Sequence, residues 1–178
     1  MNKIGHLFYI ILNIRNSLIS IILIVSACSS PLVITINEQA IYDPEGRLLI
    51  GGVSDADLQG CINLALQQQN KRDPSELTIL SCANAEISNL DNINTLPNLR
   101  FLDLGNNNLT NITPLEDLNV LGGVNLANNQ IKDVGPLFNM PNLSSVNLSG
   151  NDNIECDDLE SLQQKFGVNL GRPGTCDN

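Results

Sequence analysis

The sequence predicts an α/β solenoid made of four copies of a 22-residue pattern, closed by a helix at each end. Within each copy, apolar residues recur at the first, fourth and sixth places and again at the fourteenth, seventeenth and twentieth, and three copies carry asparagine at the ninth. A period of roughly 20 to 29 residues with fixed apolar spacing is typical of stacked repeats. The four copies are residues 77–98, 99–120, 121–142 and 143–164.

Each copy is predicted to begin with a short strand. Side chains alternate along a strand, so the fourth and sixth places face the core while the third, fifth and seventh face outward. Stacked copies then form a parallel sheet. Pro114 and Pro136 favour a 3-10 or irregular return limb over a full α-helix. Buried amides need partners, so we expect the ninth-place side chains to bond the backbone of adjacent copies as a ladder, formed by Asn107, Asn129 and Asn151.

This pattern resembles the leucine-rich repeat family, in the short form found in internalin-like bacterial surface proteins, over about half of the chain. In that family the strand side is concave and usually binds a protein. The resemblance therefore implies a non-enzymatic module that binds an unidentified protein or peptide. The candidate binding face consists of the outward residues Ile79, Ser81, Phe101, Asp103, Gly123, Asn125, Ser145 and Asn147.

Phe101 is the aromatic residue of this face, and we expect open space next to its ring because Gly123 occupies the equivalent place in the following copy. Exposed aromatic residues are favoured interface anchors, although a single exposed apolar residue needs no function. Four strands about 4.8 Å apart and about 13 Å long give a face of about 250 Å², against roughly 800 Å² per partner in a standard interface. A peptide or small sugar would fit such a face, whereas tight protein binding would need additional surface.

Both ends of the repeat block are predicted to carry caps. Residues 53–76 contain an amphipathic helix, with Ser54 as the expected N-cap residue and an apolar face that includes Cys61. Residues 165–178 form the tail of a helical C-terminal cap. Such caps cover the open ends of a solenoid.

Four cysteines lie in two pairs, one at each end of the repeat block, and permit three disulfide connectivities. Cys61 on the capping helix and Cys82 on the first strand would meet where cap and repeats touch. Cys156, at an expected core place, would then pair with Cys176. The arrangement is similar to that of leucine-rich repeat lipoproteins of Gram-negative bacteria. A four-thiolate zinc site is the alternative, which is disfavoured because about four strand spacings separate the pairs; we therefore predict no metal and no cofactor.

Residues 1–27 are predicted to be a lipoprotein signal peptide. An apolar core at residues 18–25 precedes Val25-Ser-Ala-Cys28, which resembles a bacterial lipobox and would make Cys28 the lipid-bearing amino terminus. Ser29 resembles the residue found in lipoproteins sent to an outer membrane. The alternatives are an uncleaved membrane anchor or an ordinary signal peptide.

Residues 28–52 form a predicted linker between the anchor and the cap. Two β-prone runs, 33–38 and 47–50, flank turn residues 43–46, so a hairpin or a loosely ordered spacer would both fit.

Charge and composition narrow the possible functions. From Cys28 onward, seven basic residues stand against nineteen acidic ones, a net charge of about −12, which repels nucleic acid. The single histidine, His6, lies in the segment expected to be removed, so a histidine-based active site is not predicted. We expect a monomer. The rival functions are an envelope spacer without a specific ligand and an enzyme or inhibitor that its motifs do not reveal.

Overall fold

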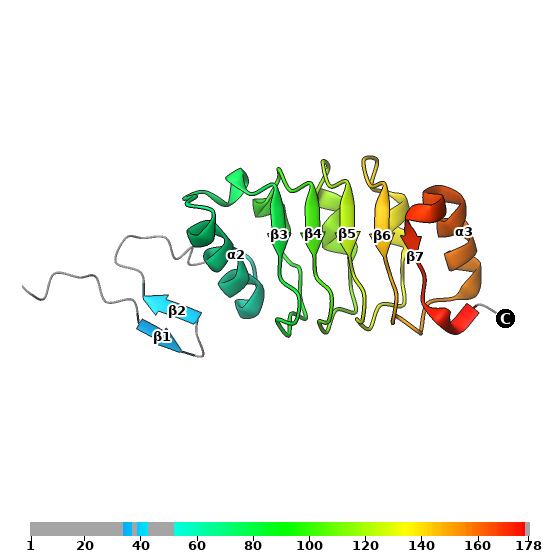
Figure 1. Cartoon of the computed structure of the whole chain (residues 1–178), viewed down its shortest axis with the longest axis horizontal. Helices are drawn as coiled ribbons and strands as arrows, with labels where there is room; N and C mark the ends of the chain where they lie inside the picture. Colours follow the sequence, from blue (N-terminus) through cyan, green and yellow to red (C-terminus); the bar gives the residue numbers. More distant parts are fainter. Residues whose placement is uncertain (1–33, 37–38, 43–51, 177–178) are drawn as a thin grey trace, which may run out of the picture. The chain divides into compact units, whose positions relative to one another are not determined.

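The repeats form a parallel sheet in the computed structural model, which describes residues 34–36, 39–42 and 52–176 (Figure 1). The sheet has five strands in sequence order, and each pairs in parallel with its neighbours. This sheet and the solenoid around it confirm the predicted fold class. The strands are β3 (Ile79–Ser81), β4 (Phe101–Asp103), β5 (Gly123–Asn125), β6 (Ser145–Asn147) and β7 (Leu170–Gly171).

The register of β3 to β6 follows the sequence period without a shift. Leu80 pairs with Leu102, which in turn pairs with Val124, and Val124 pairs with Val146. These four inward side chains are at most 3% exposed. A slip of one residue would turn the whole row toward solvent, so burial of the row determines the register.

The return limbs of the first three repeats are 3-10 helices, as predicted. They are η2 (Ile93–Thr95), η3 (Thr113–Asp117) and η4 (Gly135–Phe138). Both η3 and η4 have a proline as their second residue, in the first turn, where its missing N–H removes no helical hydrogen bond. The fourth limb is instead an α-helix, α3 (Cys156–Phe166), and it buries Leu159, Leu162 and Phe166.

The ninth-place asparagines form the expected ladder. The Asn129 Nδ2 donates to the carbonyl oxygens of Leu104 and Leu126, both at 3.0 Å, and its Oδ1 accepts the N–H of Leu109 at 3.0 Å. Asn107 and Asn151 bond neighbouring repeats in the same way. All three are at most 7% exposed, so these bonds satisfy amides that water does not reach.

The N-terminal cap consists of α2 (Ala56–Gln68) followed by η1 (Pro74–Glu76). Three side chains of α2 pack against the first repeat: Leu58, Ile62 and Leu66 are at most 2% exposed. The predicted capping role of this region therefore corresponds to a real apolar contact with the solenoid.

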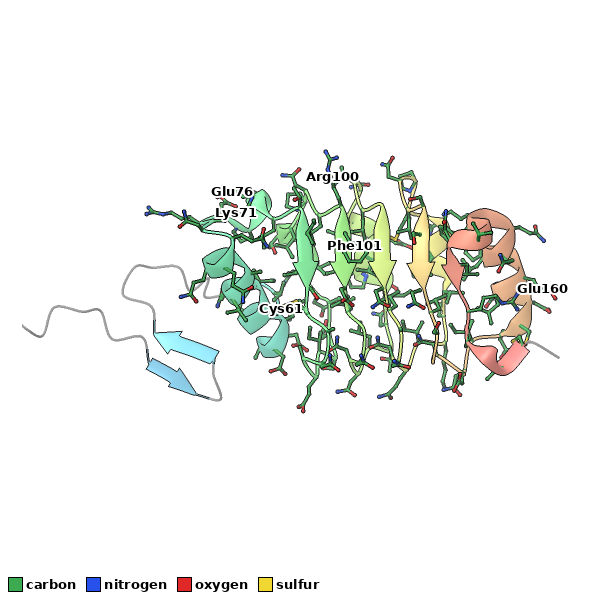
Figure 2. The ribbon with its side chains drawn as sticks, viewed as in Figure 1. Cys61, Lys71, Glu76, Arg100, Phe101 and Glu160 are labelled. Carbon is green, nitrogen blue, oxygen red and sulfur yellow. A yellow bond between two sulfur atoms is a disulfide. The ribbon has the colours of Figure 1, made fainter. Side chains whose placement is uncertain are left out.

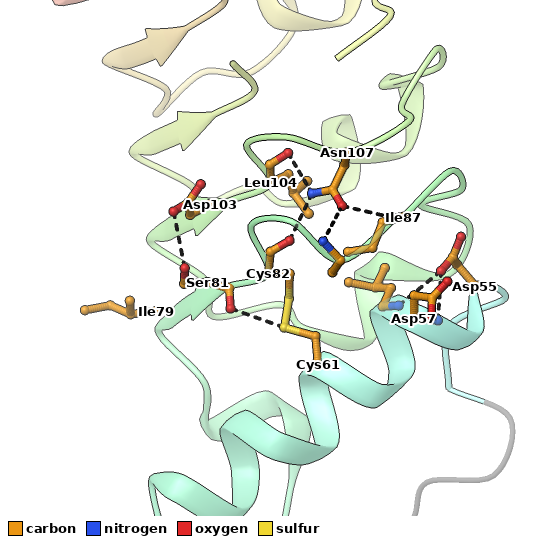
Figure 3. Close-up of a disulfide and its surroundings, with 12 residues drawn as sticks. Asp55, Asp57, Cys61, Ile79, Ser81, Cys82, Ile87, Asp103, Leu104 and Asn107 are labelled. Carbon is orange, nitrogen blue, oxygen red and sulfur yellow. Dashed lines mark hydrogen bonds between the residues drawn. A yellow bond between two sulfur atoms is a disulfide. The ribbon is translucent and has the colours of Figure 1, made fainter. Parts of the chain in front are cut away.

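The expected N-cap residue of α2 was wrong. Asp55, not Ser54, occupies the N-cap position, where one carboxylate oxygen accepts the N–H groups of Asp57 and Leu58 at 3.0 and 3.1 Å (Figure 3). The other oxygen bonds the first repeat. A carboxylate can serve both purposes at once, which the single hydroxyl of Ser54 cannot.

Two disulfides join the caps to the solenoid with the predicted pairing. Cys61 bonds Cys82, with a Cα–Cα distance of 5.8 Å, and Cys156 bonds Cys176, with a Cα–Cα distance of 5.7 Å (Figure 3 shows the first). Cys156 does not occupy a core place, however. It is exposed as the first residue of α3, because this limb is a longer helix than the other three, and Ile154 is buried instead.

The fifth strand corrects the expectation of four. β7 adds to β6 with Val146 opposite Leu170, whose side chain is 9% exposed. Leu170 lies 24 residues after Val146, because α3 uses more residues than a 3-10 limb. This break in the 22-residue period hid the strand in the sequence.

The described residues before position 46 belong to a different unit from the described residues after it. In the first unit, β1 (Ile34–Ile36) pairs antiparallel with β2 (Gln39–Tyr42), so a hairpin is present, with a different second strand from the run 47–50 that we expected. That run, the signal segment and Cys28 lie outside the described residues. Within residues 34–36, 39–42 and 52–176, no helix has the length and apolar character needed to cross a membrane.

Candidate functional site

The eight candidate residues lie on β3 to β6, and the strand register brings them into two rows across the sheet. Each row runs perpendicular to the strands, with one residue from each repeat. The third-place row is Ile79, Phe101, Gly123 and Ser145. The fifth-place row is Ser81, Asp103, Asn125 and Asn147.

The third-place row contains two large exposed apolar side chains. Ile79 is 58% exposed and Phe101 is 43% exposed, and the two residues are direct partners on β3 and β4. Figure 2 shows Phe101 near the middle of the strand face. We refer to Ile79 and Phe101 as the apolar pair.

The space expected beside Phe101 is filled by its own ring. A Cβ atom added to Gly123 would lie 3.1 Å from Cδ2 and 3.6 Å from Cε2 of Phe101, and Gly123 is buried. The ring therefore leans across the neighbouring strand, over a backbone that carries no side chain. The expectation of open space was wrong because a flexible ring can occupy a gap that a strand diagram shows as empty.

Asp103 links three strands in the fifth-place row. Its Oδ1 accepts the Asn125 Nδ2 at 2.8 Å, and its Oδ2 accepts the Ser81 Oγ at 3.2 Å (Figure 3 shows the bond to Ser81). The backbone N–H of Gly105 also donates to Oδ1 at 3.0 Å. This carboxylate is thus already supplied with three donors by the protein itself.

The side-chain amides of Asn125 and Asn147 also accept hydrogen bonds from the protein's own backbone. Asn125 Oδ1 accepts the N–H of Ala127 at 3.1 Å, and Asn147 Oδ1 accepts that of Ser149 at 3.1 Å. Asp and Asn commonly bond the backbone two residues on and so stabilise a turn. The polar character of this row is therefore explained in large part by the turn that ends each strand.

Asp55 fixes the cap at the first end of the strand face, a role that sequence reasoning missed. Its second oxygen accepts the N–H groups of Ser88 and Asn89 at 3.0 and 3.1 Å. Burial by itself raises the pKa of the Asp55 carboxyl, but the hydrogen bonds from Ser88, Leu58 and Asn89 together outweigh it and hold the pKa below its ordinary value. A sequence gives no signal for these partners, because they lie more than thirty residues away.

Lys165 has a similar role at the other end. Its Nζ donates to the carbonyl oxygens of Leu137 at 2.7 Å, Phe138 at 3.1 Å and Met140 at 3.3 Å, which ties α3 to the end of η4. Desolvation lowers the pKa of this amine. Free carbonyls at a helix C-terminus favour a cation at this position.

No group of three or more His, Cys, Asp or Glu side chains gathers in a metal-binding arrangement in the described part of the chain. The site is therefore a surface of apolar and hydrogen-bonded side chains on a rigid sheet. Such a surface can bind a partner by contact.

Two segments, residues 75–117 and 123–164, match the family described as leucine-rich repeats in two copies. Together with the parallel sheet and 3-10 limbs, this match places the repeat block in the leucine-rich repeat family.

Among solved structures, the chain is similar to an internalin (inlF) from Listeria monocytogenes, with 27% identity, a TM-score of 0.57, and coverage of 70% of this chain and 38% of that one. It also matches the functional domain of InlJ from the same species, with 22% identity, a TM-score of 0.42, and coverage of 57% and 26%. Internalin C2 (inlC2) from this species matches with 20% identity, a TM-score of 0.38, and coverage of 58% and 63%. The chain thus spans well under half the length of the inlF internalin. A search of curated proteins found no match.

Proposed function

We propose that the chain is a non-enzymatic leucine-rich repeat module that binds a protein or peptide through its concave face while tethered to the bacterial cell envelope. The observation that carries this proposal is the apolar pair. Ile79 and Phe101 are adjacent, 58% and 43% exposed, and held on paired strands. Apolar side chains gathered on a rigid surface are favoured as interface anchors.

The size of the face limits the partner. Four strands of three residues and one of two, with a rise of about 3.3 Å per residue and a spacing of about 4.8 Å, give about 220 Å², well below the roughly 800 Å² per side of a standard interface. A short peptide can bind within this area. A folded protein partner must also contact the caps or the flanks of the sheet, or bind weakly in several copies on a membrane.

The tether rests on the amino-terminal sequence. Val25-Ser-Ala-Cys28 supports lipid attachment at Cys28, and Ser29 supports delivery to an outer membrane. Two disulfides are consistent with export, because such bonds persist in oxidising compartments. Mass spectrometry of the protein from envelope fractions tests this step: we expect a chain that begins at an acylated Cys28, and an intact Met1 would refute it.

Matched phenylalanine variants test the binding face. Phe101→Ala removes an anchor that is 43% exposed on the strand side, whereas Phe138→Ala removes a ring that is 40% exposed on η4. We expect quantitative crosslinking on intact cells to show about 30-fold weaker capture of specific partners for Phe101→Ala, the effect of an anchor worth about 2 kcal/mol. The Phe138→Ala variant should capture them like the wild type.

A spacer without a specific ligand is the second candidate. The observation in its favour is that Asp103 and Asn125 bond the protein itself, so the polar row does not need a ligand to satisfy it. Equal capture by the wild type, Phe101→Ala and Phe138→Ala would support the spacer and refute the binding face.

A further inference from the structure

The two disulfides differ in how accessible their cysteines are. Cys82 is 2% exposed and Cys61 is half-buried, whereas Cys156 is exposed and Cys176 is half-buried. Thiol–disulfide exchange requires an attacking thiolate to reach a sulfur atom of the bridge. A reductant in solution therefore has better access to the C-terminal bridge than to the N-terminal one.

The N-terminal cap does not depend on its bridge alone. Leu58, Ile62 and Leu66 of α2 are at most 2% exposed against the first repeat. Asp55 adds hydrogen bonds between the start of α2 and the backbone of Ser88 and Asn89. If the Cys61–Cys82 bridge opened, these contacts would still hold α2 in place.

The C-terminal tail, residues 170–176, is a shorter segment than the N-terminal cap. Its strand β7 is two residues long, and Gly171 O accepts the N–H of Leu148 at 2.7 Å. Leu170 and Pro173 are buried, while Gly174 and Thr175 are exposed. The Cys156–Cys176 bridge additionally joins the end of the tail to the first residue of α3.

We propose that Cys156–Cys176 is a thiol–disulfide exchange site for a dithiol reductant, and that opening it releases β7 and makes β6 the edge of the sheet. One thiolate of the reductant attacks the sulfur of one cysteine of the bridge and forms a mixed disulfide with it. The sulfur of the second cysteine leaves as a thiolate, which takes up a proton. The second thiol of the reductant then displaces the protein sulfur. The bridge gains two electrons and two protons, and the dithiol becomes a disulfide.

Release of β7 changes the end of the strand face. Leu148 loses the carbonyl of Gly171, and β6 then presents unpaired backbone groups, which are a template for another strand. The Asn147 side chain, which lies against Gly171, also loses its neighbour. This device does not depend on the proposed binding function.

Graded reduction of the full, oxidised chain tests the exchange site. Dithiothreitol is added, and free thiols are alkylated and located by mass spectrometry over time. We expect Cys156 and Cys176 to become alkylated at least tenfold faster than Cys61 and Cys82. Opening of both bridges at the same rate, or of Cys61–Cys82 first, would overturn the proposal.

Hydrogen exchange tests the release of β7. After selective opening, the Leu148 amide should exchange at least tenfold faster, while the Leu104 amide, which donates to Asn125 O at 2.8 Å, stays protected. A Cys156→Ser, Cys176→Ser double variant should show the same loss, and a Cys61→Ser, Cys82→Ser control should not. If the double variant does not fold, the partly reduced wild type still decides the question: unchanged protection at Leu148 refutes the release.

Discussion

Replacement of Asp55 by alanine should destabilise the N-terminal end of the solenoid more than replacement of the neighbouring Ser54 by alanine. The Asp55 carboxylate caps α2 and accepts two backbone N–H groups of the first repeat. Loss of an N-cap costs about 1 kcal/mol, and loss of each charge-assisted bond costs about 1.5 kcal/mol before water compensates. We therefore expect Asp55→Ala to lower the free energy of unfolding by about 3 to 4 kcal/mol.

Urea denaturation of the oxidised chain, followed by circular dichroism, measures this effect. Ser54→Ala is the matched control, because the Ser54 hydroxyl accepts a single side-chain bond from Asn92 at 3.3 Å. The control should cost about 1 kcal/mol or less. A larger loss for Ser54→Ala than for Asp55→Ala would refute the assignment of Asp55 as the N-cap residue.

The same carboxylate predicts how stability depends on pH. The pKa of Asp55 lies below its ordinary value of 3.8, so its contribution is complete above pH 3.8 and is lost as the pH falls through the lower pKa of the folded state. Asp55→Ala removes this dependence. The gap in unfolding free energy between wild type and variant should thus stay constant from neutral pH to about pH 4 and narrow below it; a gap that narrows near neutral pH would contradict the mechanism.

Two further substitutions probe the repeat geometry by the same denaturation assay. Asn129→Ala leaves the buried N–H of Leu109 without a partner, while the carbonyls of Leu104 and Leu126 each keep a second donor from the ladder; it should cost about 1 to 3 kcal/mol, the range for one such unsatisfied group, and no measurable loss would contradict the ladder. Gly150→Ala places a side chain at a φ of 76° and against Asn128 Oδ1, and should cost about 1 to 3 kcal/mol, whereas no loss would show that this turn can relax.

The 22-residue period was sufficient to predict the stacked strands, their register and the asparagine ladder. These features repeat because every copy must meet the same physical requirements. Each copy needs inward side chains such as Leu102 and polar partners for the turning backbone, and two of them have a proline in the first turn of a short limb. The pairing of Cys61 with Cys82 could also be predicted. Cys61 was expected on the apolar face of the capping helix and Cys82 on the first strand, and these two surfaces meet.

The candidate face could be predicted only in outline. All eight outward residues lie in the expected two rows, because the register that places Leu80 inward must place Ile79 and Ser81 outward. Which of these side chains remain available depends on neighbours in three dimensions. Asp103 bonds residues on both adjacent strands, and the Phe101 ring covers Gly123.

The sequence alone thus determined the repeating features, whose causes lie within one copy and its identical neighbour. Only the tertiary structure decided the features at the ends, where the pattern stops. α3 lengthened the fourth limb, so that β7 pairs with β6 through Leu170, 24 residues after Val146, and Asp55 bonds the first repeat. At an end there is no next copy to supply hydrogen bonds and apolar cover, so residues distant in sequence must supply them, and no local pattern reveals which ones do.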